Sequence, residues 1–64
     1  MKFSSELEAI ETLRCCPGVD YVMAKLLVKM VREKWSVAET EFKKFGVEDL
    51  YKSIYSFYHG DNNE

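Results

Sequence analysis

The sequence DYVMAKLLVKMVREK, residues 20–34, is the most informative stretch of this chain about its architecture. Its apolar residues recur at spacings of three and four, the period of an α-helix, and Asp20 is suited to cap its start. They cover well over half of the helix circumference: Val22, Met23, Leu26, Leu27, Met30 and Val31. A helix this apolar needs neighbours on more than one side. We therefore predict that this segment is the central helix of the fold.

The segment before it predicts a shorter helix, from about Ser5 to Arg14 or Cys15. Ser4 or Ser5 can accept a hydrogen bond from a free N–H group of the first turn. The sequence Cys16-Pro17-Gly18 then ends the helix, because a residue that precedes proline disfavours the α conformation. The apolar side that we expect to face the core consists of Leu7, Ile10 and Leu13, with Ala9 beside them.

A third helix is predicted from about Val37 to Phe45. Ser36 and Glu39 have the spacing of a capping box, in which the serine bonds forward and the glutamate bonds back. Gly46 is suited to the left-handed conformation that often follows the last turn of a helix. Ala38 and Phe42, followed by Phe45, are expected to face inward.

A fourth helix is predicted from about Glu48 to His59, with Gly60 closing it. Glu48 and Asp49 lie in its first turn, where negative charge is favourable. Its core stripe is expected to contain Val47, Leu50, Ile54 and either Phe57 or Tyr58. Tyr51 and Tyr55 lie beside that stripe, four residues apart.

These patterns predict an all-α fold, a compact bundle of four short helices. The chain of 64 residues has room for one domain, which we place at residues 1–60, with 61–64 as a frayed acidic tail. No sustained alternation of apolar and polar residues predicts a strand.

The composition narrows the functional classes. The net charge of −2 argues against a dedicated nucleic-acid coat. Cys15 and Cys16 are adjacent, which is the wrong spacing for an unstrained disulfide and favours a reducing compartment. The first residues contain no apolar signal segment, and no run approaches the roughly 18 apolar residues of a membrane span. We expect a cytoplasmic protein without a membrane partner.

The sequence does not predict an enzyme. Cys15, Cys16 and His59 are the residues that could support thiol chemistry, but the cysteines follow a helix C-terminus, where the dipole opposes a thiolate. Two adjacent cysteines and one distant histidine are too few for a structural zinc site. No glycine-rich phosphate loop is present. We therefore expect no catalytic residues, no metal and no cofactor.

Two groups of side chains are candidates for binding a partner. Lys25, Lys29 and Arg32 recur on one side of the central helix and form a basic stripe. Residues 21–34 contain four basic side chains and one acidic one, so that this segment carries +3 and the remainder −5. The alternative is a solvated face without a ligand.

The second group lies in the last helix and contains Tyr51, Tyr55, Tyr58 and His59. Core packing is one use of these tyrosines. However, the chain contains nine aromatic residues, and so small a core cannot enclose them all. Exposed tyrosine beside phenylalanine is typical of a binding surface.

A stretch of the second half resembles a known bacterial family. It runs Phe42-Lys43-Lys44-Phe45-Gly46-Val47-Glu48-Asp49-Leu50 and continues to Tyr55 and His59. Over residues 36–60 it is similar to the uncharacterised domain-of-unknown-function family 3791, with the same spacing from Gly46 to the tyrosine and the histidine. It departs from that family in a shorter segment before Phe42, in Tyr58-His59-Gly60 instead of Leu-His-Thr, and in lacking most of the tail. The resemblance implies a small cytosolic helical accessory protein, often encoded near ADP-ribosyltransferase-like genes, and no catalytic residues.

Two functional hypotheses follow. The first is a non-enzymatic protein-interaction module, such as a phage, mobile-element or antitoxin-like inhibitor, which binds another protein or a second copy of itself as a homodimer. The alternative is a small nucleic-acid-binding protein that uses the basic stripe of the central helix, and it is the less favoured of the two. A salt-dependent shift with DNA or RNA would separate them.

Overall fold

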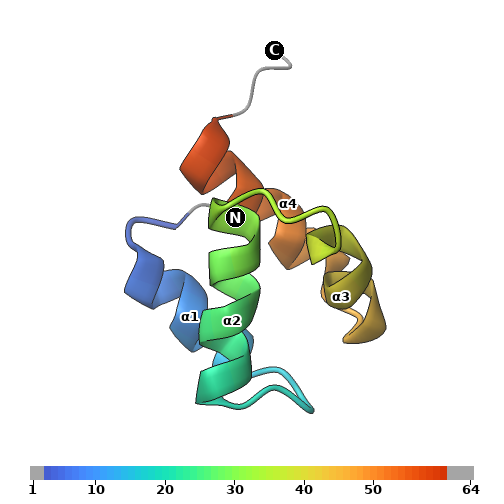
Figure 1. Cartoon of the computed structure of the whole chain (residues 1–64). Helices are drawn as coiled ribbons and strands as arrows, with labels where there is room; N and C mark the ends of the chain where they lie inside the picture. The colour runs from blue at the N-terminus through green and yellow to red at the C-terminus, as the bar shows by residue number, and fades with distance from the viewer. Residues whose placement is uncertain (1–2, 61–64) are drawn as a thin grey trace.

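The computed structural model describes residues 3–60 and contains four α-helices (Figure 1). They are α1 (Glu6–Arg14), α2 (Tyr21–Arg32), α3 (Ala38–Lys44) and α4 (Glu48–His59). The described part of the chain contains no strand, so the predicted all-α bundle of four short helices is confirmed. The predicted tail, 61–64, lies outside the described residues.

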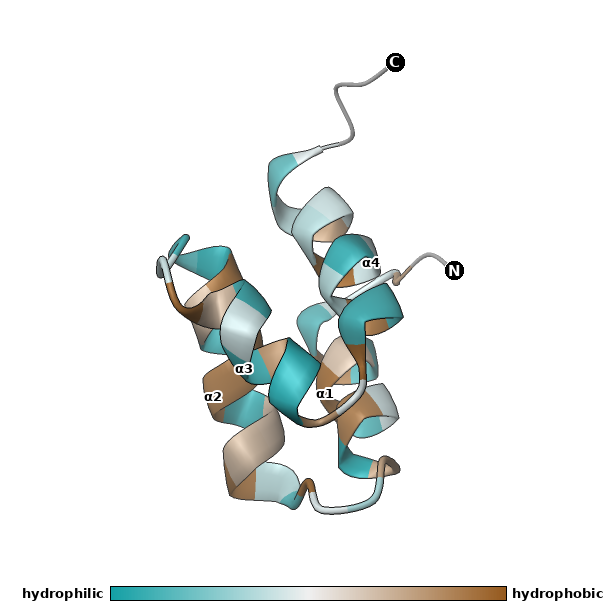
Figure 2. Cartoon of the chain, turned by 90° about the vertical axis from the view of Figure 1, so that its right-hand side faces the viewer, coloured by the Kyte–Doolittle hydropathy of each residue, from teal (hydrophilic) through white to brown (hydrophobic). Residues whose placement is uncertain are grey.

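Helix α2 is the centre of the arrangement, as its sequence predicts. It contacts each of the other three helices. In Figure 1, α1 lies on one side of α2 and α3 on the other, while α4 crosses behind its upper part. In Figure 2, hydrophobic stretches of its ribbon alternate with hydrophilic ones. This position leaves only one side of α2 uncovered.

Side chains cap the first two helices where the sequence predicts it. The N–H of Glu8 donates to Ser5 Oγ at 3.2 Å, and the N–H of Met23 donates to Asp20 Oδ1 at 2.8 Å. Each bond satisfies a backbone donor that has no partner within its helix. Gly46 has a φ of 71°, the left-handed conformation expected after α3.

The predicted capping box at Ser36 is wrong. Helix α3 begins at Ala38, its N-cap is Val37, and no side chain caps it. The N–H of Ala38 instead donates to the carbonyl oxygen of Trp35 at 3.1 Å. A tight backbone turn therefore takes the place of the serine. Helix α2 also ends earlier than predicted, at Arg32, because the chain turns at Lys34 with a φ of 57°.

The core is built from the inner sides of all four helices together with Phe3 and Val19. Its fully enclosed large side chains are Leu13, Leu27, Val28, Val31, Phe42 and Ile54. Three residues predicted to belong to it do not. Leu7 is 59% exposed, Val22 is 74% exposed and Leu26 is 40% exposed. The physical reason is that the helices packed around α1 and α2 leave one side of each uncovered, and these three positions lie there.

The alternative left open in α4 is settled in favour of Tyr58. Tyr58 packs against the core, together with Val47 and Leu50, while Phe57 is 36% exposed. Both tyrosines beside the stripe, Tyr51 and Tyr55, take the flank that the sequence predicts. None of the four described helices has the length and apolar character required to cross a membrane.

Candidate partner-binding face

The uncovered side of α2 exposes large apolar side chains. Ala24, Leu27 and Val28 turn inward and are completely buried. Val22 and Leu26 lie one turn apart and are both exposed. Val22 contributes little to the folding of its own chain, because it is 74% exposed, whereas Leu26 is 40% exposed and buries the larger part of its surface.

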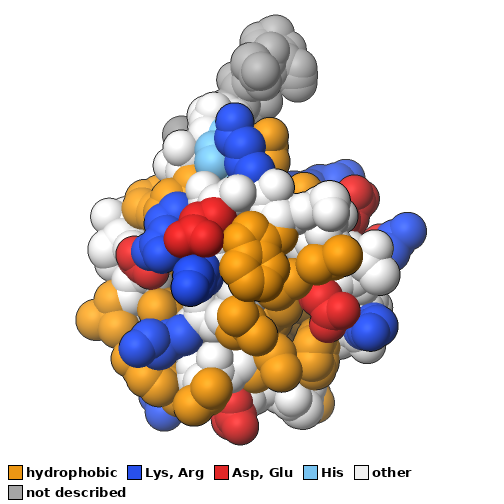
Figure 3. Space-filling view, in the orientation of Figure 1, with side chains coloured by type: hydrophobic (Ala, Val, Ile, Leu, Met, Phe, Trp, Pro, Cys, Tyr) orange, Lys and Arg blue, Asp and Glu red, His pale blue; other side chains and the backbone are white. Residues whose placement is uncertain are grey.

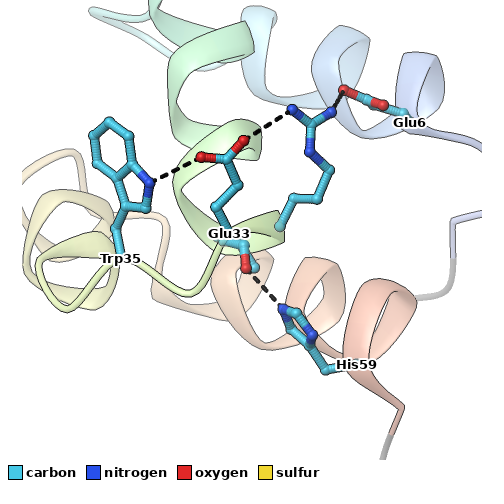
Figure 4. A network of polar contacts seen from close by, with 6 residues as sticks. Glu6, Glu33, Trp35 and His59 are labelled. Atoms are coloured by element: carbon cyan, nitrogen blue, oxygen red, sulfur yellow. Dashed lines mark hydrogen bonds and ion pairs between the residues drawn. The ribbon is translucent and has the colours of Figure 1, made fainter.

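Trp35 extends this apolar surface beyond the end of α2. Its backbone N–H donates to the carbonyl oxygen of Met30 at 2.8 Å, which brings the chain back against the last turn of the helix. Its indole Nε1 donates to Glu33 Oε1 at 3.2 Å, and the side chain is still 41% exposed (Figure 4). We call Val22, Leu26 and Trp35 the α2 band. Figure 3 shows hydrophobic side chains gathered over α2 and toward α3, with basic side chains beside them.

The basic stripe predicted from the sequence is exposed, but its three members differ. Lys25 and Lys29 form no ion pair with any residue in the range 3–60. The ammonium group of Lys25 lies 5.5 Å from the centroid of the Tyr21 ring, a cation–π contact. Two positive charges are therefore left free beside the α2 band.

Arg32, in contrast, forms ion pairs with two carboxylates of its own chain. Its Nη1 lies 3.0 Å from Glu6 Oε2 on α1, and its Nη2 lies 3.5 Å from Glu33 Oε2. Figure 4 shows the resulting chain of contacts from Trp35 through Glu33 and the guanidinium group to Glu6. Arg32 thus joins α1 to the end of α2 and fixes the carboxylate that holds the indole.

The tyrosines of α4 form an aromatic row along the helix. Tyr51 meets the ring of buried Phe42 edge-on at 5.5 Å, Tyr55 follows at 5.9 Å, and His59 lies 4.6 Å beyond Tyr55. His59 Nε2 lies 2.8 Å from the carbonyl oxygen of Val31. Burial and the negative charge of Glu39 raise the pKa of the Tyr51 phenol. This row connects α4 to α3 and α2, so most of it serves packing.

Tyr58 lies on the other side of α4, near the ion pair between Glu6 and Arg32. Its hydroxyl group is buried and has no hydrogen-bond partner in the described part of the chain. Burial raises the pKa of Tyr58, the Glu6 carboxylate raises it further, and Arg32 opposes the shift. Glu6 is close enough to act on this phenol electrostatically, but it does not meet the geometry of a hydrogen bond with it.

Within residues 3–60, no hydrogen bond joins either thiol to His59. Cys15 is exposed and Cys16 is half-buried, and both are free. The Cys16 thiol donates to the carbonyl oxygen of Thr12 at 3.7 Å, while His59 is engaged by Val31 and Tyr55. Between residues 3 and 60, no three His, Cys, Asp or Glu residues cluster in a way that could hold a metal ion.

One feature of the sequence could have predicted that Val22 of the α2 band is exposed. Val22 and Lys29 are seven residues apart, so they lie within about 20° of each other around a helix. A solvated Lys29 therefore implies an exposed Val22. Trp35 gave no such signal, because its position depends on the turn that follows α2.

Comparison of the chain with protein-family models, with curated proteins and with solved structures finds no match.

Proposed function

We propose that this protein is a small non-enzymatic interaction module that binds another protein through the α2 band. The observation that carries the proposal is the exposure of Val22, Leu26 and Trp35 beside two unpaired lysines. Aromatic and aliphatic anchors bordered by charge are the usual composition of a binding surface. The chain gains little stability from keeping these side chains outside, and a partner that covers them would remove apolar surface from water.

The proposed biological role is that of an accessory or inhibitor-like factor, which acts by occupying a surface of its target. A domain of this size suits such a role, because it needs only one face for binding. The likeness of residues 36–60 to family 3791 remains a prediction, and it would add an antitoxin-like or mobile-element setting. Self-association through the same face is the second form of the proposal.

Nucleic-acid binding is less well supported by the charges. Of the three residues in the basic stripe, Arg32 is occupied by Glu6 and Glu33. Two further basic residues, Lys43 and Lys44, are also paired. Lys43 Nζ lies 3.9 Å from Glu48 Oε2, and Lys44 Nζ lies 3.2 Å from Glu41 Oε2. A phosphate backbone needs several free cations along one track, and Lys25 and Lys29 provide two.

The test is a pull-down from lysate of the source cell, with and without nuclease, followed by mass spectrometry. The baits are the wild type, Val22→Glu in the α2 band, and Leu7→Glu as a matched substitution at an exposed apolar residue of α1. Far-UV circular dichroism confirms that each bait is folded. We expect the wild type and Leu7→Glu to capture the same protein with and without nuclease. Val22→Glu should not capture it.

Two outcomes would contradict the proposal. Capture that Val22→Glu retains would show that the α2 band is not the binding surface. Capture that disappears with nuclease would favour the nucleic-acid alternative, in which case Lys25 and Lys29 would be the residues to change next. Sedimentation of the three baits at high concentration reports whether the wild type pairs with itself.

A further inference from the structure

We propose that the segment that occupies the α2 band is an amphipathic helix of the partner with acidic residues along one edge of its apolar face. This inference rests on the proposed function and names the chemistry of the partner. Three observations support it: the shape of the band, the placement of the two lysines, and the contacts that already engage the carboxylate of Glu33.

The band has the shape of a helix-packing surface. It extends from Val22 to Glu33, where the indole of Trp35 is fixed. At a rise of about 1.5 Å per residue this is about 16 Å, the length of three helical turns. Beyond the first turn of α2, from Ala24 onward, the backbone N–H groups are bonded within the helix, so most of the band presents side chains rather than backbone donors. A partner segment must then satisfy its own backbone hydrogen bonds, as a helix does and an extended peptide does not.

The charges beside the band select an acidic partner. Lys25 and Lys29 lie one turn apart on the outer side of α2, and neither is paired within the described residues. Glu33, the carboxylate at the end of the band, already binds the Trp35 indole and Arg32. The free charge along this edge is therefore positive. Acidic side chains four residues apart on a facing helix would match the two lysines.

The same charges disfavour a second copy of this chain as the occupant. Packing α2 against α2 of another copy would bring Lys25 and Lys29 of both copies to one interface. Four ammonium groups would then approach one another, while Glu33, a carboxylate one turn beyond Lys29, already binds Arg32 and the Trp35 indole. Like charges that face each other across an interface oppose association.

The test is selection of helical peptides on the immobilised protein. The probe is a phage-displayed library of alanine-rich helices whose positions on one face are randomised among leucine, lysine, glutamate and alanine. We expect the wild type to enrich peptides with leucines at helical spacing and glutamates along one edge. The double variant Lys25→Glu/Lys29→Glu should bind those peptides about tenfold more weakly and should instead enrich lysine-bearing peptides. Lys43→Glu/Lys52→Glu, with the same change of net charge elsewhere, should select as the wild type does.

The outcomes separate this inference from the proposed function. Peptides that depend on Val22 but show no excess of glutamate would overturn the acidic partner and leave the α2 band as a binding face. An equal loss of binding in the control pair would show that net charge, and not Lys25 and Lys29, selects the peptides, which also overturns it. If every enriched peptide binds the Val22→Glu variant as well as the wild type, or if no peptide is enriched, a helix is not the occupant of the α2 band. A wild-type dimer that Val22→Glu dissociates would favour a second copy.

Discussion

His59, the last residue of α4, donates from its Nε2 atom to the carbonyl oxygen of Val31 in the last turn of α2, at 2.8 Å. A carbonyl oxygen only accepts, so this ring nitrogen carries the proton. The carbonyl oxygen of Val31 also accepts from the backbone N–H of Lys34 at 3.1 Å, so the histidine is its second donor. The contact also joins the end of the fourth helix to the central one.

Replacing this histidine should weaken that junction. We expect His59→Ala to lower the free energy of unfolding by about 1 kcal/mol, the usual net contribution of one hydrogen bond. Urea denaturation measures the change, with Lys52→Ala on the exposed side of α4 as the control. Equal stability of His59→Ala and the wild type would show that water replaces the histidine without cost.

Removing the buried hydroxyl of Tyr58 should have the opposite effect. Because this hydroxyl has no partner among the described residues, Tyr58→Phe should raise the free energy of unfolding by about 1 kcal/mol at neutral pH. Tyr55→Phe, at an exposed phenol, should change little. A loss of stability in Tyr58→Phe would mean that Glu6 or a water molecule binds the hydroxyl in solution.

The same phenol should also affect how the stability of the fold decreases at alkaline pH. Its pKa is raised above 10.0, mainly by burial, so the folded state favours the neutral form. The contribution of Tyr58 to stability is therefore complete below pH 10.0 and is lost as the pH rises through the higher pKa of the folded state. Thermal melts between pH 9 and 11.5 (about one unit or more on either side of the reference pKa) should fall less steeply for Tyr58→Phe than for the wild type. Parallel curves would contradict this assignment.

Glu8 should act at the acid limit. Its carboxylate accepts hydrogen bonds from the backbone N–H and the hydroxyl of Ser4, at 2.6 and 2.9 Å, and these bonds lower its pKa below 4.5. The stabilising effect is present above pH 4.5 and is lost as the pH falls through the lower pKa of the folded state. Glu8→Gln should flatten the loss of stability on acidification, measured by urea denaturation. Glu39→Gln, at a carboxylate without a hydrogen bond in the described chain, should leave the curve unchanged.

Lys34 should be improved by glycine. Its φ of 57° places it in the left-handed region, which costs an L-residue about 1 kcal/mol and costs glycine little. We expect Lys34→Gly to raise the melting temperature by several degrees in a chain this small. Lys34→Ala has the same backbone restriction as lysine and should give no gain. An equal gain from both substitutions would assign the effect to the charge instead.

Leu26 and Leu27 should respond very differently to the same truncation. Leu27 is completely buried, so Leu27→Ala should cost about 2–5 kcal/mol, while exposed Leu26→Ala should cost about 0.5 kcal/mol. The whole domain is stabilised by roughly 3–10 kcal/mol, so the first variant is close to unfolding. Circular dichroism during denaturation compares the two. Similar losses would mean that Leu26 also belongs to the core.

Leu26 and Leu27 show which features of this fold can be predicted from nearby residues and which depend on tertiary packing. Periodic spacing, the caps at Ser5 and Asp20 and the glycine at position 46 are local features, and they were sufficient to predict four helices close to their observed positions. The basic stripe was also predicted from spacing alone. The Ser36 cap failed because a backbone turn at Trp35 satisfied the helix start first.

The helices, their order and the central place of α2 follow from local sequence patterns, because each pattern involves residues within one or two turns of one another. Which part of the apolar surface of α2 is covered depends on the packing of the whole chain. Leu26 and Leu27 are chemically identical, and their burial depends on where α1, α3 and α4 pack. That arrangement left Val22 and Leu26 outside and placed Trp35 beside them, because the three neighbours leave one side uncovered on a helix that is apolar around more than half of its circumference.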